Sequence, residues 1–348
     1  MSKKKKVLLV GGAGFIGHNL ALKYLSRGHE VVIADSLQVN NFLYLLDSSS
    51  EVTEPTLYEQ IIQERIQILR EKNLKFLIAD FRDYHATSRI VSSVEPDIVV
   101  MLAAVSHASR SNKDPFSTFD HSLRTLENVL DAIRNKTGTR LVFMSSSTVY
   151  GNFKDPIVDE ESRCEPIGIY ASLKLAGELI VKAYSQISEL EYTIIRPSAL
   201  YGERCISRRV GQIYIENAIA NRPLIVSATK DEKLDFTYIE DLLEGIYLAS
   251  TKNSGINQTF NITRGDAQPI YRLVEILEKR FPNIVTENIP RDKLVPKRGT
   301  LSNQKAKELL NFHSQYPIKI GYNLYIDWYI NFIDKYKIEM SKNSQFNE

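Results

Sequence analysis

Three observations predict an α/β fold built on a doubly wound parallel sheet, with a smaller α/β domain after it. Short apolar strands alternate with helix-length segments through the first half of the 348 residues. The first strand runs directly into a glycine-rich turn that opens a helix pattern. Beyond about residue 190 the strands become short and prolines become frequent. Strands that alternate with helices pair in parallel, and the helical connection between two such strands makes a right-handed crossover.

The elements of the first half follow from their apolar runs and periodicity. Strands are predicted at Val7–Val10, Val31–Ala34, Phe76–Ala79, Ile98–Leu102 and Leu141–Ser145. Helices are predicted at Gly14–Arg27, Tyr84–Val94, Phe116–Arg134 and Ile169–Ile187. The connection between Asp35 and Phe76 is unusually long, and its later part has a helical apolar period. We expect a surface addition there, with a lid over the ligand as the alternative.

The second half divides less cleanly. Tyr192–Arg196 is predicted to be a further strand of the main sheet, and the segment from about 234 to 262 returns to the same unit. The expected domains are therefore 1–190, together with that return, and 191–348. The second domain closes over the carboxyl edge of the sheet, where ligands of doubly wound folds bind.

The composition is that of an ordinary globular protein, with 43% hydrophobic and 25% charged residues. A net charge of +2 gives no reason to expect nucleic acid or an anionic membrane as a partner. No apolar stretch is long enough to span a bilayer, and no signal peptide precedes the first strand. The six histidines show no metal-ligand spacing, and the two cysteines show no redox spacing, so we expect no metal and a cytoplasmic location.

The glycine-rich turn predicts a dinucleotide site. Gly12, Gly14 and Gly17 fit G-x-G-x-x-G, which lets the backbone approach a pyrophosphate at the start of a helix. Asp35 ends the second strand, where a carboxylate accepts hydrogen bonds from ribose hydroxyls and repels a 2′-phosphate. No Arg or Lys stands among the residues just after it. The sequence thus predicts a Rossmann domain that binds NAD rather than NADP.

Tyr170 and Lys174 lie four residues apart, which places them on one face of a convincing helix. A nearby ammonium stabilises a phenolate, so the pair can serve as a general acid and base. Tyr150 and Lys154 have the same spacing, but Gly151 and Pro156 indicate a loop there. Tyr170 is therefore the predicted catalytic tyrosine.

Together these motifs resemble the extended short-chain dehydrogenase/reductase family, in its NAD-dependent epimerase/dehydratase branch. The resemblance rests on the glycine turn, Asp35, the Tyr170/Lys174 pair and further segments along nearly the whole chain. Those segments are Asp80–Asp83, Leu102–Ala104, Phe143–Gly151, Arg196–Gly202, Asp235–Asp241, Phe260–Ile262 and Lys297–Gly299. It implies a nucleotide-sugar epimerase, with Tyr170, Lys174 and Ser146 as catalytic residues.

The resemblance also implies where the ligands bind. The implied NAD-binding residues are Gly11, Gly14, Phe15, Ile16, Gly17, Asp35, Asp80, Phe81, Leu102, Ala103, Ala104, Tyr170, Lys174 and Pro197. The candidates for binding the nucleotide-diphosphate sugar are Ser147, Arg204, Arg209, Lys297 and Arg298. The family often has Asn where Ala199 stands and Arg where Leu234 stands, so this chain must hold the substrate diphosphate in another way.

Two residues after Ser146 bear on the reaction. The 4,6-dehydratases of the family have Asp-Glu there, whereas this chain has Ser147 and Thr148, which do not ionise usefully at neutral pH. This favours oxidation and re-reduction of one carbon, most simply C4 epimerisation through a transient keto sugar. A 4,6-dehydratase, another dehydrogenase or reductase of the same fold, and a non-catalytic NAD sensor remain the alternatives. Family members pair through two helices, here Phe116–Arg134 and Ile169–Ile187, so a homodimer is expected.

Overall fold

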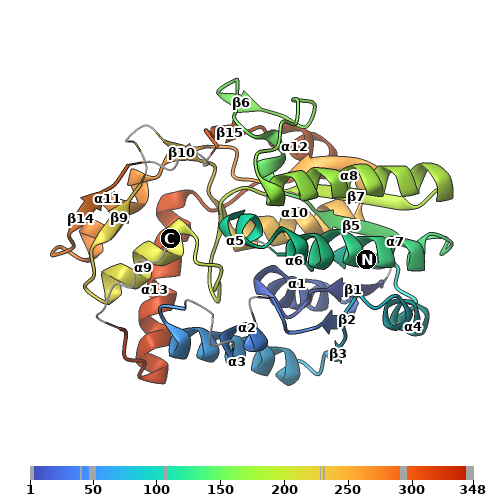
Figure 1. Cartoon of the computed structure of the whole chain (residues 1–348), viewed down its shortest axis with the longest axis horizontal. Helices are drawn as coiled ribbons and strands as arrows, with labels where there is room; N and C mark the ends of the chain where they lie inside the picture. The colour runs from blue at the N-terminus through green and yellow to red at the C-terminus, as the bar shows by residue number, and fades with distance from the viewer. Residues whose placement is uncertain are drawn as a thin grey trace.

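A seven-stranded, wholly parallel sheet forms the centre of the computed structural model, which describes residues 4–39, 41–46, 52–105, 108–227, 229, 232–290 and 296–341 (Figure 1). Its strands are β1 (Lys6–Val10), β2 (Glu30–Asp35), β3 (Lys75–Ile78), β4 (Ile98–Met101), β5 (Arg140–Met144), β7 (Glu191–Arg196) and β12 (Gln258–Asn261). Their order is β12-β7-β5-β4-β1-β2-β3. The chain changes direction across the sheet between β1 and β4, so a crevice opens at the carboxyl ends of these two strands.

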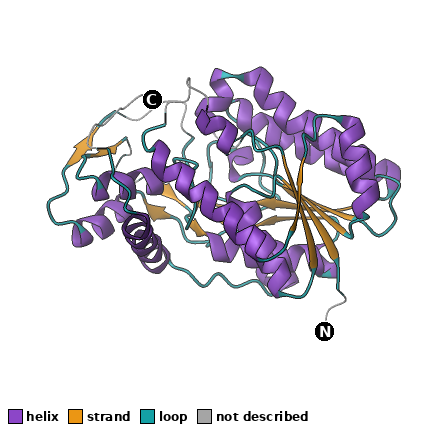
Figure 2. Ribbon diagram, turned by 90° about the horizontal axis from the view of Figure 1, so that it is seen from below, coloured by secondary structure: helices purple, strands orange, loops and turns teal. Residues whose placement is uncertain are grey.

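Helices cover both faces of this sheet (Figure 2). Along β1 the side chains alternate, because Val7 and Leu9 join one apolar cluster while Leu8 and Val10 join the other. The first cluster includes residues of α1 (Phe15–Ser26), α3 (Pro55–Glu71) and α10 (Ile239–Thr251). The second includes residues of α4 (Tyr84–Val94), α7 (Thr125–Ile133) and α8 (Ile169–Ser188). The predicted α/β, doubly wound fold class is confirmed.

The predicted helix over Phe116–Arg134 is divided. It comprises α6 (Pro115–Phe119), a π-helical turn over Asp120–Arg124, and α7. The π turn inserts one extra residue per turn into an otherwise continuous helix, a feature that is frequent at functional sites. Short helices α2 (Phe42–Leu46) and α5 (Ala108–Lys113) precede this segment.

A second region of short strands and helices lies beyond the carboxyl edge of the sheet (Figure 1). Its paired strands are β6 (Ile157–Val158) with β15 (Thr300–Leu301), β8 (Leu200–Tyr201) with β11 (Thr237–Tyr238), β9 (Leu224–Val226) with β14 (Thr286–Asn288), and β10 (Lys233–Leu234) with β13 (Gln268–Pro269). Its helices are α9 (Val210–Ile219), α11 (Tyr271–Arg280) and α13 (Ile318–Tyr336), whereas α12 (Gln304–Leu310) packs against α10 and β12 of the sheet region. Because β7 and β12 complete the main sheet, the chain crosses between the two regions more than once.

The helix α3 corrects the expectation of a surface addition. Its apolar face is fully buried at Leu57, Ile61 and Ile62, and it packs beside α1. On its other side Tyr58 donates a hydrogen bond to Glu216 of α9 at 2.8 Å, so α3 joins the sheet region to the smaller one. The structure does not test the lid alternative. In the described part of the chain, no helix is long and apolar enough to cross a membrane.

Candidate functional site

The glycine turn after β1 brings three parts of the backbone unusually close together. Gly11 has a φ of +84°, and a Cβ there would lie 2.6 Å from the amide nitrogen of Ala103 at the end of β4. A Cβ on Gly17 would lie 2.5 Å from the Cα of Gly12, so α1 packs directly on the turn. Gly14 begins α1 without a side-chain cap, and no acid stands in the first turn. The first amide groups of α1 are therefore left for an anionic ligand.

Asp35 lies beside this turn at the end of β2. Its carboxylate accepts hydrogen bonds from the amide of Ala13 at 2.9 Å and from the amide of Leu37 at 2.7 Å. Burial raises the pKa of Asp35, and these two amide donors oppose the rise. The carboxylate thus fixes the glycine turn and keeps acceptor capacity toward the pocket, as a ribose diol requires.

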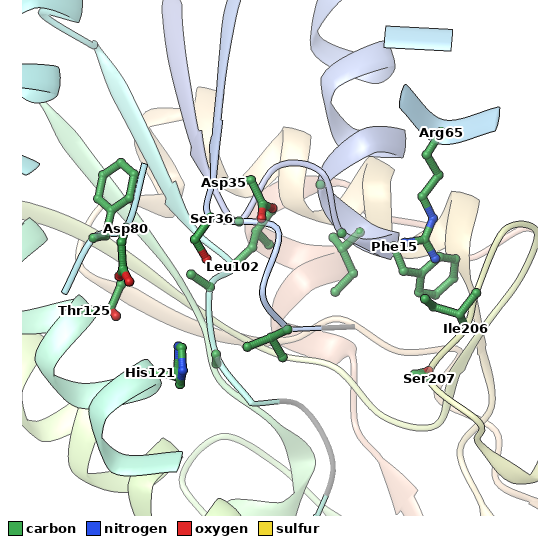
Figure 3. A pocket seen from close by; sticks show the side chains of 18 of the residues that line it. Phe15, Asp35, Ser36, Arg65, Asp80, Leu102, His121, Thr125, Ile206 and Ser207 are labelled. Atoms are coloured by element: carbon green, nitrogen blue, oxygen red, sulfur yellow. The ribbon is translucent and has the colours of Figure 1, made fainter. Parts of the chain in front are cut away.

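A pocket at the carboxyl ends of β1, β2 and β4 gathers most of the predicted cofactor residues (Figure 3). Those that line it are Gly11, Gly14, Phe15, Ile16, Gly17, Asp35, Asp80, Phe81, Leu102, Ala103 and Ala104. Arg209, predicted for the substrate, lines it as well. The predicted residues Tyr170, Lys174, Ser146, Ser147, Pro197, Arg204, Lys297 and Arg298 do not line it.

Nine of the described lining residues were not predicted as site residues, and Arg65, His121, Thr125 and Ser207 are among the polar ones. His121 lies within the π turn and Thr125 directly follows it, and both face the pocket in Figure 3. An i→i+5 turn has no residue signature of its own, so the sequence held no signal for these two. Arg65 lies in the long connection, where no motif marks it.

Lys174 joins α8 to the end of β5, which leads into the serine cluster Ser145–Ser147. Its Nζ donates to the carbonyl oxygen of Met144 at 2.6 Å and lies 5.9 Å from the ring centre of Tyr170. Burial lowers the pKa of Lys174, while Tyr170 and Glu178 oppose that shift. Tyr170 itself is half-buried at the start of α8. A phenol and an ammonium in this arrangement can pass a proton to or from a bound hydroxyl.

The competing pair at Tyr150 and Lys154 is arranged differently. Tyr150 is 2% exposed, and its hydroxyl donates to Asn261 at 2.8 Å and accepts from Arg196 at 2.9 Å. Lys154 is exposed and forms a salt bridge with Glu165. The hydroxyl of Tyr150 is therefore engaged in buried hydrogen bonds within the protein, which supports Tyr170 as the predicted catalytic tyrosine.

The serine cluster begins just after β5. Ser146 accepts a hydrogen bond from the amide of Thr148 at 3.2 Å and starts the 3₁₀ turn over Ser147–Tyr150. Ser147 accepts a hydrogen bond from Nη1 of Arg298 at 3.2 Å. The pKa of Arg298 is lowered to about 10 by burial and by the charge of Arg209, whereas Tyr170 opposes that shift. The charges of Arg209 and Arg298 thus act on each other, and two neighbouring cations suit an anionic ligand.

The other cationic candidates have different surroundings. Arg204 donates to Nε2 of His18 at 3.0 Å and to Asn19 at 3.2 Å, so its guanidinium faces α1. Lys297 is exposed, and its backbone amide and carbonyl are held by Asn152 and Phe153, respectively. The geometry therefore gives no support to Arg204 as a substrate ligand, and the role of Lys297 stays a prediction.

The pocket lies where the strand order reverses between β1 and β4. It contains the start of α1, which has no side-chain cap, and the carboxylate of Asp35. These features define a dinucleotide-binding protein of the doubly wound class. The model of the NAD dependent epimerase/dehydratase family matches residues 7–263, and the chain belongs to that family. NAD is the cofactor of the family, and the residues of the pocket suit it.

Known proteins resemble the chain over nearly its whole length. The UDP-glucuronate 4-epimerase of Thermodesulfobacterium geofontis is 25% identical over 343 residues, which cover 97% of this chain and 98% of that protein. The UDP-glucuronic acid 4-epimerase of Bacillus cereus, solved with UDP-glucuronic acid and NAD, has a TM-score of 0.82 at 24% identity and covers 93% of this chain and 98% of its own. A dTDP-glucose 4,6-dehydratase from Streptomyces venezuelae, solved with NAD, has a TM-score of 0.81 at 21% identity, with coverages of 95% and 98%. These structural likenesses show a shared fold.

Proposed function

We propose that the protein is an NAD-dependent nucleotide-sugar epimerase that inverts C4 of its substrate through a transient keto sugar. The observation that carries the proposal is the absence of an ionisable side chain in the segment Ser146–Thr148, directly after the strand that Lys174 contacts. Elimination of water needs an acid and a base at such a place, whereas epimerisation needs only one proton-transfer group. The 4-epimerases among the relatives support the same choice.

Each residue then has a limited task. Bound NAD supplies the reversible hydride acceptor. Tyr170 removes the proton of the C4 hydroxyl and later returns it, directly or through the hydroxyl of Ser146. Lys174, buried against Met144, stabilises the ionised form of Tyr170 and holds α8 in register with β5. Asp35 and the first turn of α1 orient the cofactor.

The reaction in D₂O separates this proposal from a dehydratase. We expect a panel of UDP-, GDP- and dTDP-sugars, followed by NMR, to yield one C4 epimer with no solvent deuterium at C5. A substrate deuterated at C4 should return its label to C4 with inverted geometry. A 4-keto-6-deoxy product, or deuterium at C5, would show that other residues supply an elimination and would overturn the proposal.

We further propose that Arg209 and Arg298 hold the diphosphate of the substrate, in place of the family residues missing at Ala199 and Leu234. Arg209 lines the cofactor pocket, and Arg298 reaches Ser147 from the opposite region of the fold. The charge of Arg209 acts unfavourably on Arg298 in the absence of an anion, and a diphosphate offers two negative groups for bidentate contacts.

A homodimer is part of the proposal. Large apolar side chains are exposed on α6 and α8, notably Phe116 at 84%, Leu179 at 60% and Ile187 at 75%. The two helices pack against each other, so these side chains lie on neighbouring elements. A second copy of the chain would remove them from water. Light scattering at micromolar concentration should give twice the chain mass, and a monomeric mass would refute it. A cytoplasmic location stays a prediction.

A further inference from the structure

Arg65 is the largest fully buried side chain of the molecule's described part, and it lies against the cofactor pocket. It extends from α3 toward Phe15 and Ile206, beside the first turn of α1 (Figure 3). Its Nε donates to the carbonyl oxygen of Arg204 at 3.0 Å, and its Nη2 donates to the same oxygen. This contact fixes the plane of the guanidinium group.

The third nitrogen of Arg65 has no partner. Nη1 is buried and forms no hydrogen bond within the described residues. A buried N–H without an acceptor is unfavourable, and it is more so on a charged group. The arginine remains protonated at neutral pH, since burial lowers its pKa only to about 10.

The charges around Arg65 do not neutralise it. None of the ion pairs formed within the described ranges includes Arg65. Arg204 is a second cation nearby, and His18 stays neutral because burial and these two arginines lower its pKa. Glu64 lies 3.8 Å from Arg204, and the charge of Asp35 acts on Arg65 from the pocket, where its two oxygens each accept a hydrogen bond from a backbone amide. Arg65 itself has no carboxylate partner among the described ion pairs, and it lies beside the uncapped start of α1.

We propose that Arg65 binds the diphosphate of the dinucleotide cofactor, with Nη1 donating to a phosphate oxygen that also faces the first turn of α1. The inference rests on the cofactor in the proposed function and does not depend on which sugar reacts. It gives α3 a role that no sequence motif marks, because this helix supplies a cation to a site otherwise built from backbone amides. It also explains why so large a charged side chain is buried beside the glycine turn.

The test compares ligands that differ in the diphosphate. Protein freed of cofactor is titrated calorimetrically with NAD, ADP and adenosine. We expect Arg65→Gln to weaken NAD and ADP binding by about 10- to 100-fold and to leave adenosine binding unchanged. A purely structural role for Arg65 would weaken all three ligands together, and unchanged ADP affinity would equally overturn the inference.

Arg222 offers a matched control. Its guanidinium is 3% exposed and pairs with Glu54 at 2.7 Å at the start of the same helix, outside the cofactor pocket. Arg222→Gln should lower the stability of the fold while retaining the wild-type ratio of ADP to adenosine affinity. Failure of the unaltered protein to bind NAD would refute the cofactor itself, and so is distinct from failure of the Arg65 inference.

A conservative variant covers the case in which Arg65→Gln does not fold. Arg65→Lys keeps the buried charge but lacks the planar fork with which arginine contacts the carbonyl of Arg204 through two nitrogens while Nη1 faces elsewhere. We expect its ADP affinity to fall several-fold relative to adenosine. Wild-type ADP affinity in this variant would contradict the proposed contact.

Discussion

Glu178 and Arg196 form a buried, two-point ion pair between α8 and β7. Nε of Arg196 donates to Oε1 of Glu178 at 2.9 Å, and Nη2 donates to Oε2 at 2.6 Å. The side chains are 1% and 4% exposed, respectively. Glu178 stands one helical turn beyond Lys174 and also accepts a hydrogen bond from Ser145. Glu178 and Arg196 therefore hold α8, which carries Tyr170 and Lys174, against β5 and β7.

Loss of one partner of this pair should be costly. Glu178→Gln keeps the size of the side chain but leaves the charge of Arg196 buried without a counterion. We expect the free energy of unfolding to fall by about 3–5 kcal/mol, measured by urea titration. The double variant Glu178→Gln/Arg196→Met should lose less than the sum of the two single variants. Strict additivity would mean that the two side chains do not interact. Glu165→Gln, at an exposed salt bridge, is the control and should leave the free energy of unfolding nearly unchanged.

The two tyrosines with a lysine four residues later should behave oppositely. Tyr170→Phe removes the proton-transfer group, and we expect kcat to fall by about 10²- to 10⁴-fold with an unchanged melting temperature. Tyr150→Phe leaves Arg196 and Asn261 each short of a partner, so it should cost about 1–3 kcal/mol of stability and retain most of the activity. Steady-state kinetics and thermal melting of both variants test this prediction. If Tyr150→Phe alone were inactive, Tyr150 would be the catalytic tyrosine in place of Tyr170.

The three arginines near the smaller region should separate by function. Arg209→Gln and Arg298→Gln each remove a cation proposed to contact the diphosphate, and we expect kcat/KM to fall about 10- to 100-fold. Arg204→Gln is the matched control, because that guanidinium faces His18 and Asn19. It should lower stability and leave KM for the nucleotide sugar near the wild-type value. An equal fall in kcat/KM for all three variants would contradict the proposal that Arg209 and Arg298, but not Arg204, contact the diphosphate.

His18 should give the fold a specific acid sensitivity. Nε2 accepts from Arg204, so the proton lies on Nδ1 and is donated to the carbonyl of Gly14 at 2.9 Å. Burial, Arg65 and Arg204 lower the pKa of His18 well below 6.5, so below that pH the unfolded chain binds a proton that the folded chain does not. Stability is therefore present above pH 6.5 and falls as the pH drops through it, by up to about 1.4 kcal/mol per pH unit.

The variant His18→Gln tests this directly. Glutamine can accept from Arg204 and donate to Gly14 without titrating, so the stability of this variant should fall less between pH 7 and pH 5 than that of the wild type. His313→Gln removes an exposed imidazole and should keep the wild-type slope. Part of the slope will remain, because burial also lowers the pKa of His29. Identical slopes for His18→Gln and wild type would refute the argument.

Much of the fold could be predicted from local patterns, because apolar runs determine where strands begin and end. The predicted strand Val7–Val10 lies within β1, and the predicted helix Ile169–Ile187 within α8. The direction of a cation in a loop could not be predicted in this way. Arg204 has a φ of +63°, a left-handed conformation unusual for arginine, and the chain there presents the side chain to α1. Arg65 was missed because its importance depends on a contact with a carbonyl 139 residues further along the chain.

The order of the sheet has a consequence for how the chain can be divided. The strands β7 and β12 follow residue 190, yet β7 pairs with β5 along its length. A fragment ending at residue 190 would expose the unpaired backbone N–H and C=O groups of β5 at the edge of the sheet, so we expect this fragment to aggregate. A second fragment that carries the residues after 190 would have to add both β7 and β12 to the sheet. We therefore expect a protein divided at residue 190 to fold only when the two fragments are co-expressed. The fragments should then copurify as one complex.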